Sequence, residues 1–149
     1  MKSVDTIESV LKLKGREVLS VGPAATVYEA IEKMSEKGVG SLLVMSEGNL
    51  AGIISERDYA RKVILMDRSS KQTRVRDIMT SPVMTVTPRD TVEHCMRTMT
   101  ENRIRHLPVV DRDRVVGVIS IGDMVNWIIT AHEETIGHLQ SYIAGQYPG

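Results

Sequence analysis

The sequence predicts an α+β fold made of two βαββα repeats that pack together with pseudo-twofold symmetry. The first observation is an internal duplication: adding 65 to positions 21–58 reproduces the second half without a gap, with 12 identities over 38 positions. The second observation is that helical and strand periodicities follow one another in the same order in both copies. One copy of about 60 residues would have only a marginal core, so we expect the two copies to pack against each other.

The first copy gives a local signal for each of its elements. Residues 1–14 predict a short helix that ends at Gly15, and residues 17–21 predict a short strand. Thr26 opens the next helix, with Glu29 three residues later as its capping-box partner. The remaining elements follow in order: the two strands of a β-hairpin over 41–45 and 50–54, and a helix from Ser55.

The second copy repeats this order after a polar, basic linker over 68–76. We expect a short helix over 75–80, and a last helix that runs from Asp123 to about Ala144. The other predicted elements are a strand over 83–86, a helix with Val92 and Cys95 on its apolar face, and a hairpin over 106–110 and 115–119. The predicted organisation is therefore an N-terminal helix (1–15), a first repeat (16–71), a second repeat (72–131), and a C-terminal helix and tail (132–149).

Composition excludes several classes of protein. Apolar residues make up 42% and charged residues 26%, which is typical of a globular chain. Lys and Arg number 19 and so do Asp and Glu, so no net charge favours nucleic acid or an anionic membrane. The single cysteine, Cys95, excludes an internal disulfide framework. No apolar run has the length of a membrane span and no signal peptide is recognisable, so we expect a cytoplasmic protein.

The sequence contains no recognisable catalytic constellation. Its four histidines form no i, i+4 pair and stand beside no cysteine or carboxylate set with metal-ligand spacing. The phosphate loop, the dinucleotide fingerprint and the nucleophile elbow are all missing. We therefore predict neither an enzyme nor a metal site.

A Gly-apolar-Ile-Ser-x-x-Asp motif occurs twice, at 52–58 and 117–123, where a strand enters a helix. The serine hydroxyl lies beside unpaired N–H groups and suits a phosphate, and the aspartate could accept hydrogen bonds from two vicinal hydroxyls. Serine at the N-cap with an acid three residues later is also close to a capping box. Both interpretations stay open on the motif alone.

Basic residues near both motifs favour a bound anion. Arg57, Arg61 and Lys62 lie on the first of these helices, and Arg103 and Arg105 lead into the strand beside the second motif. Cations at a helix N-terminus are unfavourable for the helix dipole, so a bound anion would explain them. A solvated charged face is the structural alternative.

The doubled motif, the Arg-His-Leu-Pro-Val-Val-Asp run over 105–111 and the βαββα order resemble a tandem pair of cystathionine-β-synthase (CBS) domains, the Bateman module. The resemblance covers about residues 16–130 and is similar to short bacterial proteins that consist of this module alone. It implies two clefts between the sheets that bind adenine nucleotides or related adenosyl ligands, and a disc-like homodimer.

The resemblance also implies a role for particular residues in one cleft. Ser120 would lie near a phosphate, Asp123 would hold the ribose hydroxyls, and Arg105 and His106 would contact phosphates. The residues implied to complete this cleft are Val39 and Gly40 at the adenine, with the region around the first strand from Lys14 to Leu19.

In the twin cleft, the resemblance implies that Ser55 and Asp58 repeat these roles, with Arg57 and Lys62 on the phosphates. Its other implied members are Met79, Thr80 and Ile104. The copies depart from each other, because Gly40-Ser41 stands where the second copy has Arg105-His106, and Gly122 stands where the first has Arg57. We therefore expect the clefts to differ in affinity, with the Asp123 cleft the tighter.

These observations predict a regulatory module, not an enzyme. It would bind AMP, ADP, ATP or a dinucleotide such as NAD, form a homodimer and signal cellular energy or redox state to a protein partner. One alternative is a structural or protein-interaction dimer without ligand. Another is a nucleic-acid-binding accessory protein, suggested by the basic stretch between 57 and 76.

Overall fold

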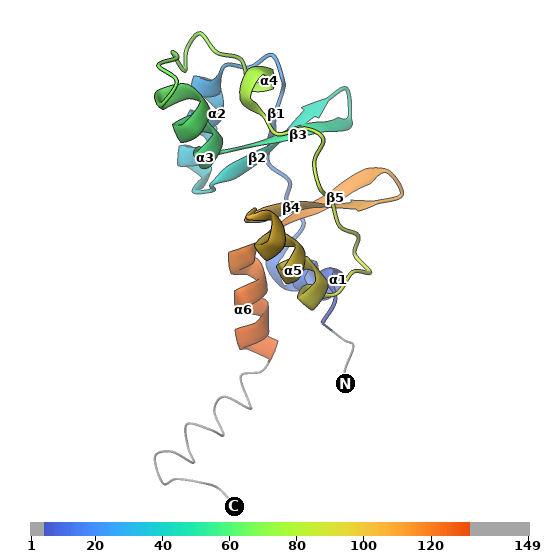
Figure 1. Cartoon of the computed structure of the whole chain (residues 1–149). Helices are drawn as coiled ribbons and strands as arrows, with labels where there is room; N and C mark the ends of the chain where they lie inside the picture. The colour runs from blue at the N-terminus through green and yellow to red at the C-terminus, as the bar shows by residue number, and fades with distance from the viewer. Residues whose placement is uncertain (1–4, 132–149) are drawn as a thin grey trace, which may run out of the picture.

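The computed structural model describes residues 5–131 and contains two βαββα repeats stacked one above the other (Figure 1). The β-hairpins of the two repeats lie in the middle, and helices lie above and below them. The elements of the first half are α1 (Ile7–Lys14), β1 (Ser20–Val21), α2 (Val27–Lys37), β2 (Ser41–Ser46), β3 (Asn49–Ser55), α3 (Glu56–Tyr59) and the π-helix η1 (Ala60–Ile64). Those of the second half are α4 (Val75–Ile78), α5 (Val92–Asn102), β4 (His106–Asp111), β5 (Arg114–Ser120) and α6 (Ile121–Ala131).

The two hairpins confirm the duplication in their strand register. β2 and β3 pair antiparallel with Val44 opposite Gly52, and β4 and β5 pair with Val109 opposite Gly117, which is the same register 65 residues later. Both hairpins shift register directly after this pair. Because the offset reproduces pairing as well as sequence, the repeats share one backbone plan.

The third strand is present in only one repeat. β1 pairs parallel with β2, but the strand predicted over 83–86 is reduced to an isolated bridge between Val86 and Val109. In the first repeat the N–H of Leu43 donates to the carbonyl of Leu19, a bond that extends the ladder. The residue equivalent to Leu43 is Pro108, which has no N–H to donate. The prediction of a second such strand was wrong for this reason.

Helix caps follow the local sequence. Thr26 and Glu29 form the predicted capping box at the start of α2, and α1 ends at Gly15 as predicted. α2 ends at Gly38 with a left-handed φ of 68°, whereas α5 ends at Arg103 with a φ of 54°. An arginine thus adopts a conformation that glycine takes more easily. The part of the predicted C-terminal helix beyond Ala131 lies outside the described residues.

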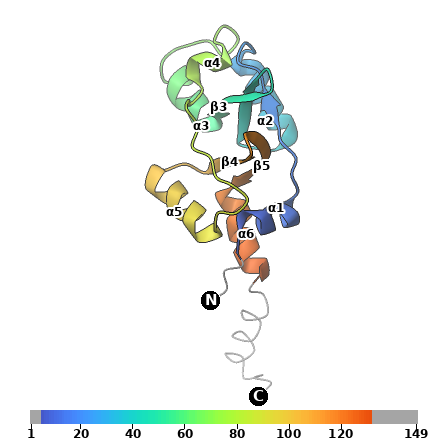
Figure 2. The same cartoon turned by 90° about the vertical axis from the view of Figure 1, so that its right-hand side faces the viewer.

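Two short helices pack into the repeat that they do not precede. Ile7, Val10 and Leu11 of α1 lie in the core of the second repeat, and α1 lies against α6 (Figure 2). Val75 and Ile78 of α4 lie in the core of the first repeat. The core of the second repeat is therefore built from two separated parts of the chain.

The glycine of each repeated motif makes room for these helices. A Cβ added at Gly117 would lie 2.7 Å from a methyl carbon of Leu11, and one at Gly52 would lie 2.9 Å from the carbonyl oxygen of Thr80. Both approaches are closer than a side chain allows, so this part of the motif serves packing. No helix within residues 5–131 is long and apolar enough to cross a membrane.

Two candidate ligand clefts between the repeats

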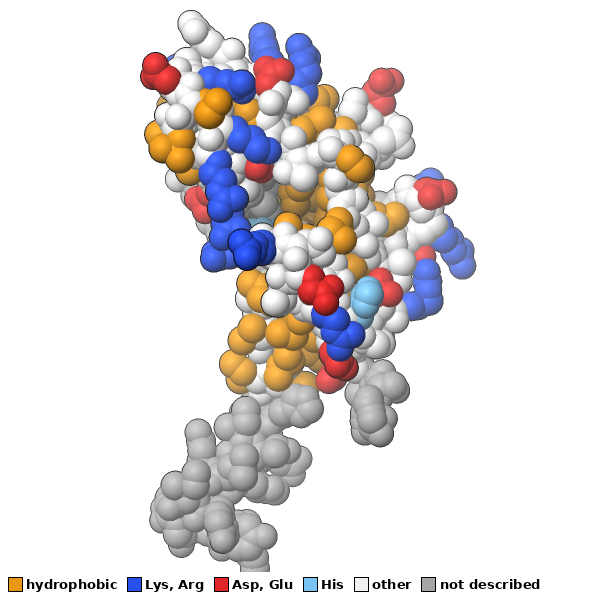
Figure 3. All heavy atoms as spheres, in the orientation of Figure 1, with side chains coloured by type: hydrophobic (Ala, Val, Ile, Leu, Met, Phe, Trp, Pro, Cys, Tyr) orange, Lys and Arg blue, Asp and Glu red, His pale blue; other side chains and the backbone are white. Residues whose placement is uncertain are grey.

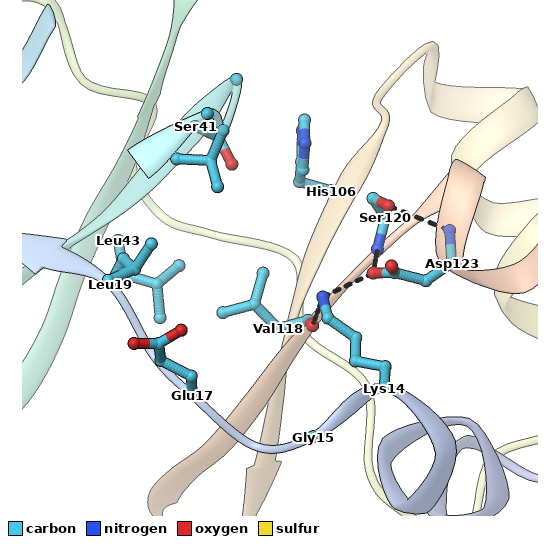
Figure 4. Close-up of a pocket in the computed structure, with 13 residues that line it drawn as sticks. Lys14, Gly15, Glu17, Leu19, Ser41, Leu43, His106, Val118, Ser120 and Asp123 are labelled. Carbon is cyan, nitrogen blue, oxygen red and sulfur yellow. Dashed lines mark hydrogen bonds and ion pairs between the residues drawn. The ribbon is translucent and has the colours of Figure 1, made fainter. Parts of the chain in front are cut away.

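The Asp123 cleft is a cavity of about 420 Å³ between β2 of the first repeat and β4, β5 and α6 of the second (Figure 4). Its volume lies within the range of small-molecule sites. Its lining residues are Lys14, Gly15, Glu17, Leu19, Gly38, Val39, Gly40, Ser41, Leu43, His106, Val118, Ser120 and Asp123.

The Ser120–Asp123 pair forms a complete reciprocal cap at the start of α6. The N–H of Ser120 donates to Asp123 Oδ2 at 2.8 Å, and the N–H of Asp123 donates to Ser120 Oγ at 3.1 Å. Lys14 Nζ also donates to Asp123 Oδ2 at 2.5 Å and to the carbonyl oxygen of Val118 at 2.6 Å. Within the described residues Asp123 Oδ1 accepts no hydrogen bond, so this oxygen is available to a ligand.

His106, like Gly40, lines both clefts. Burial lowers the pKa of the imidazole, and the positive charges of Lys14 and Arg105 lower it further, while Asp123 opposes the shift. The imidazole is therefore neutral at pH 7 and offers a ligand one N–H and one lone pair.

The Asp58 cleft has a volume of about 490 Å³ and lies between α3 and β3 of the first repeat and the α5–β4 connection of the second. Its lining residues are Gly40, Ile53, Ser55, Glu56, Arg57, Asp58, Arg61, Thr80, Pro82, Val83, Met84, Asn102, Arg103, Ile104, Arg105 and His106. Both clefts thus take residues from both repeats.

Asp58 has less free hydrogen-bonding capacity than Asp123. Its Oδ2 accepts from the N–H and the hydroxyl of Ser55 at 2.9 and 3.1 Å, and its Oδ1 is 3.2 Å from Lys62 Nζ. Lys62 Nζ also donates to the carbonyl oxygen of Ile78 at 2.9 Å. The amino group of Lys62 would have to move before a ribose could bind both oxygens of Asp58.

The structure brings together most of the residues named from the sequence. In the Asp123 cleft the only named residue missing from the wall is Arg105, which lines the Asp58 cleft instead. Arg105 lines only the Asp58 cleft, whereas the next residue, His106, lines both. The named residues that do line the Asp123 cleft are Lys14, Leu19, Val39, Gly40, His106, Ser120 and Asp123.

In the Asp58 cleft, two named residues are absent from the wall. Met79 lies under β3, where its sulfur would be 2.6 Å from a Cβ at Gly52, and it packs against the first core. Lys62 reaches the cleft only through its ion pair with Asp58. The named residues on the wall are Ser55, Arg57, Asp58, Thr80 and Ile104.

Sequence reasoning did not assign several lining residues to a cleft. The sequence marks Arg61 and Arg103 only as cations near a cleft, and it includes Glu17 only as part of the region 14–19. Two signals could have found the arginines. Arg61 is one helical turn beyond Arg57, and Arg103 is the equivalent of Gly38 in the other cleft at the 65-residue offset.

Other reactive groups lie outside the clefts. Burial raises the pKa of Cys95 to about 12, with Asp90 adding to the shift, so its thiol stays protonated inside the second core. Over residues 5–131 no group of three or more His, Cys, Asp or Glu side chains could hold a metal ion.

Comparison with known proteins points to one family. The family model for the CBS domain matches residues 10–65 and again residues 75–130. The CBS domain-containing protein CBSX3, mitochondrial, of Arabidopsis thaliana is 44% identical over 151 residues, covering 95% of this chain and 73% of that protein.

Solved structures agree with this match. A protein with CBS domains from Burkholderia ambifaria superimposes with a TM-score of 0.82 at 49% identity, covering 84% of this chain and 94% of that one. The CBS domain pair of protein MJ0100, solved in complex with 5′-methylthioadenosine and S-adenosyl-L-methionine, superimposes with a TM-score of 0.73 at 25% identity. That alignment covers 83% of this chain and 94% of the MJ0100 chain.

Proposed function

The chain belongs to the CBS-domain family as a pair of CBS repeats, and from this premise we propose that it is a regulatory module, not an enzyme, that binds adenosyl ligands in its two clefts. The ligands in question are AMP, ADP, ATP, dinucleotides of the NAD type and uncharged or cationic adenosyl compounds. The observation that carries the proposal is the pair of Ser-x-x-Asp turns, each on the wall of a cavity of about 420 or 490 Å³. The MJ0100 complex supports it, because a related CBS pair holds two adenosyl compounds.

The Asp123 cleft offers each part of a nucleoside a matching surface. Asp123 Oδ1 is free to accept a ribose hydroxyl while Oδ2 keeps the cap intact. Leu19, Val39 and Leu43 supply apolar contact for a purine, and the buried Ser41 adds a hydroxyl. A ligand that takes both oxygens of Asp123 displaces Lys14, so we expect the Lys14–Asp123 ion pair to open on binding.

Regulation follows from the position of the clefts. Each cavity is lined by both repeats, so a ligand binds most tightly to one relative placement of the repeats and shifts the population toward it. A partner that recognises this placement would read the ligand concentration. No covalent step is needed for this role.

Titration calorimetry with AMP, ADP, ATP, NAD, 5′-methylthioadenosine and S-adenosylmethionine tests the proposal. A ligand of about 23 heavy atoms at roughly −0.3 kcal/mol per atom binds with a Kd of about 10 μM. We expect at least one ligand in this range, with Asp123→Asn or Asp58→Asn weakening it by about tenfold or more. Asparagine keeps an acceptor for the cap, and Asp67→Asn, at an exposed turn, is the matched control. If none of the six ligands binds wild-type protein at millimolar concentration, the proposal is wrong.

We also propose that the module forms a homodimer through its outer helices. Exposed apolar side chains gather at the end of η1, with Ile64 56%, Leu65 76% and Met66 60% exposed, and on α6, with Val125 43% and Ile129 53% exposed. Pairing of two copies would cover such surfaces. Light scattering should give twice the mass of one chain, and Val125→Glu should reduce the measured mass.

A cytoplasmic location stays a prediction, since CBSX3 is named as a mitochondrial protein.

A further inference from the structure

The Asp58 cleft is lined by a concentration of positive charge. Arg57, Arg61, Arg103 and Arg105 face the cavity, against the carboxylates of Glu56 and Asp58. Asp58 is already paired with Lys62, so the cavity is lined by four arginines and by a single carboxylate, that of Glu56, which forms no ion pair within residues 5–131. Figure 3 shows Lys and Arg side chains in a band down the left side, reaching the junction of the two repeats.

The Asp123 cleft has the opposite balance. Among the described residues that line it, Lys14 is the one Lys or Arg, and its amino group donates to Asp123 Oδ2 and to the carbonyl oxygen of Val118. Glu17 lies beside Leu19 on the wall opposite Lys14 and Asp123 (Figure 4). Burial lowers the pKa of His106, so the imidazole adds no positive charge at pH 7. One lysine therefore faces two carboxylates.

The difference in charge between the clefts comes from substitutions at equivalent positions of the two repeats. At the 65-residue offset, Arg57 corresponds to Gly122, Arg103 to Gly38, and Arg105 to Gly40. Arg61 corresponds to Asn126, and Glu17 corresponds to Pro82. Three arginines of the Asp58 cleft thus have glycines at the equivalent positions of the other copy. Glu17 of the Asp123 cleft has a proline at its equivalent position. The two clefts therefore share one backbone plan, but the side chains on their walls differ in the sign of their charge.

Charge decides which 5′ substituent each cleft accepts. A diphosphate or triphosphate carries two to four negative charges that arginine forks hold through paired, charge-assisted hydrogen bonds. In the Asp123 cleft the same group would meet the carboxylates of Glu17 and Asp123, and like charges repel. An uncharged or cationic substituent avoids this repulsion.

We propose, on the basis of the function proposed above, that the two clefts bind different classes of adenosyl ligand. The Asp58 cleft binds nucleotides with a polyphosphate tail through Arg57, Arg61, Arg103 and Arg105. The Asp123 cleft binds adenosyl compounds whose 5′ substituent carries no net negative charge, and Glu17 excludes phosphorylated ones. The module then reports the ratio of two ligand classes and not the level of one nucleotide.

ATP and 5′-methylthioadenosine are the two probes for calorimetric titration of the full chain. Asp58→Asn should weaken ATP by at least tenfold and leave 5′-methylthioadenosine within twofold of wild type, and Asp123→Asn should do the reverse. The double variant Arg61→Gln/Arg103→Gly should weaken ATP alone by at least tenfold. Glycine suits the left-handed backbone at position 103, so this variant keeps the fold. Arg89→Gln/Arg97→Gln, which removes two exposed arginines outside both clefts, is the charge-matched control.

Salt and Glu17 provide two further readouts. Raising the salt from 50 to 300 mM should weaken ATP several-fold and 5′-methylthioadenosine hardly at all, because screening acts on the ionic contacts. Glu17→Gln should admit ATP to the Asp123 cleft as a second binding event. Loss of ATP binding in Asp123→Asn but not in Asp58→Asn, or equal losses of both ligands in the arginine variant, would overturn the inference while leaving the proposed function standing. Binding of neither probe to wild-type protein would overturn both.

Discussion

The aspartates of the repeated motif serve the helix and the cleft at once. The cap and the ligand site are alternatives in the sequence, yet the structure shows two closed caps, at Ser55–Asp58 and Ser120–Asp123, on the walls of two cavities. The cap uses a single oxygen of each carboxylate, Oδ2, so it does not exhaust the hydrogen-bonding capacity of the group. Capping is therefore no argument against binding, and it holds the carboxylate in a fixed position before a ligand arrives.

His106 should make folding stability depend on pH. Its pKa in the folded protein is lowered by burial and by Lys14 and Arg105, so the unfolded chain takes up a proton at higher pH than the native one. Above the ordinary pKa of about 6.5 both states are neutral and the stability is complete. As the pH falls through 6.5 toward the native pKa, the unfolded state gains a proton first and the free energy of unfolding decreases.

Urea denaturation at pH 8, 7, 6 and 5.5 measures this effect. Wild type should lose more stability between pH 7 and pH 5.5 than His106→Asn, which lacks the titrating group. Other groups titrate equally in both proteins, so the difference between them isolates His106. Identical pH profiles for the two proteins would contradict the assignment.

At the scale of elements, the sequence predicts what neighbouring residues determine. Thr26 with Glu29 marks the start of α2, and the 65-residue offset places both hairpins in the correct register. The sequence does not show that α1 and α4 exchange repeats, because their apolar faces suit either core. The sequence also does not show the effect of Pro108. This residue has no N–H to donate to a third strand near Val86, and it lies more than 20 residues from that segment.

The cleft residues divide in the same way. The repeated motif places Ser120 and Asp123 on one cleft, whereas the structure places Arg105 on the other cleft from the one that the resemblance implies. Met79 packs close to the backbone at Gly52, where its flexible side chain fits the narrow space. Such contacts depend on distances between elements, which spacing in one chain does not give.

The exchange of α1 can be tested through Leu11 and Gly117. Leu11 is fully buried in the second core, so Leu11→Ala should lower the free energy of unfolding by about 2–5 kcal/mol. Gly117→Ala should cost about 1–3 kcal/mol, because the added methyl would lie 2.7 Å from Leu11 Cδ2. Urea denaturation of both single variants and of the double variant gives the coupling.

We expect the double variant to be more stable than the sum of the single effects, because alanine at 117 fills part of the space that Leu11 leaves. Leu13 lies on the same helix and is 45% exposed. Leu13→Ala is therefore the control and should change the free energy of unfolding by less than about 0.5 kcal/mol. Strictly additive effects would mean that α1 does not pack on β5.

At the scale of the whole molecule, the two repeats share more than a linker. α1 connects the start of the chain to the second core, and Thr80 returns from α4 to form a bridge with Ile53 of β3. Leu43 is only 1% exposed and belongs to neither core, and it lines the Asp123 cleft between the repeats. Unfolding of one core should therefore destabilise the other, and the clefts between the repeats exist only while both repeats are folded.

Cys95 reports this cooperativity. Its thiol is 0% exposed and has a pKa of about 12, so a thiol reagent reaches it only when the second repeat opens. Met34→Ala alters only the first core, where Met34 is 1% exposed, and should destabilise it by at least about 2 kcal/mol. If the repeats unfold as one unit, labelling of Cys95 at pH 8 should accelerate about 30-fold or more, the factor that corresponds to that free energy. Glu36→Gln, on the exposed face of the same helix, is the control and should leave the rate unchanged. An unchanged rate in Met34→Ala, measured alongside its lowered urea midpoint, would mean that the repeats open independently and that a ligand in either cleft could not hold them together.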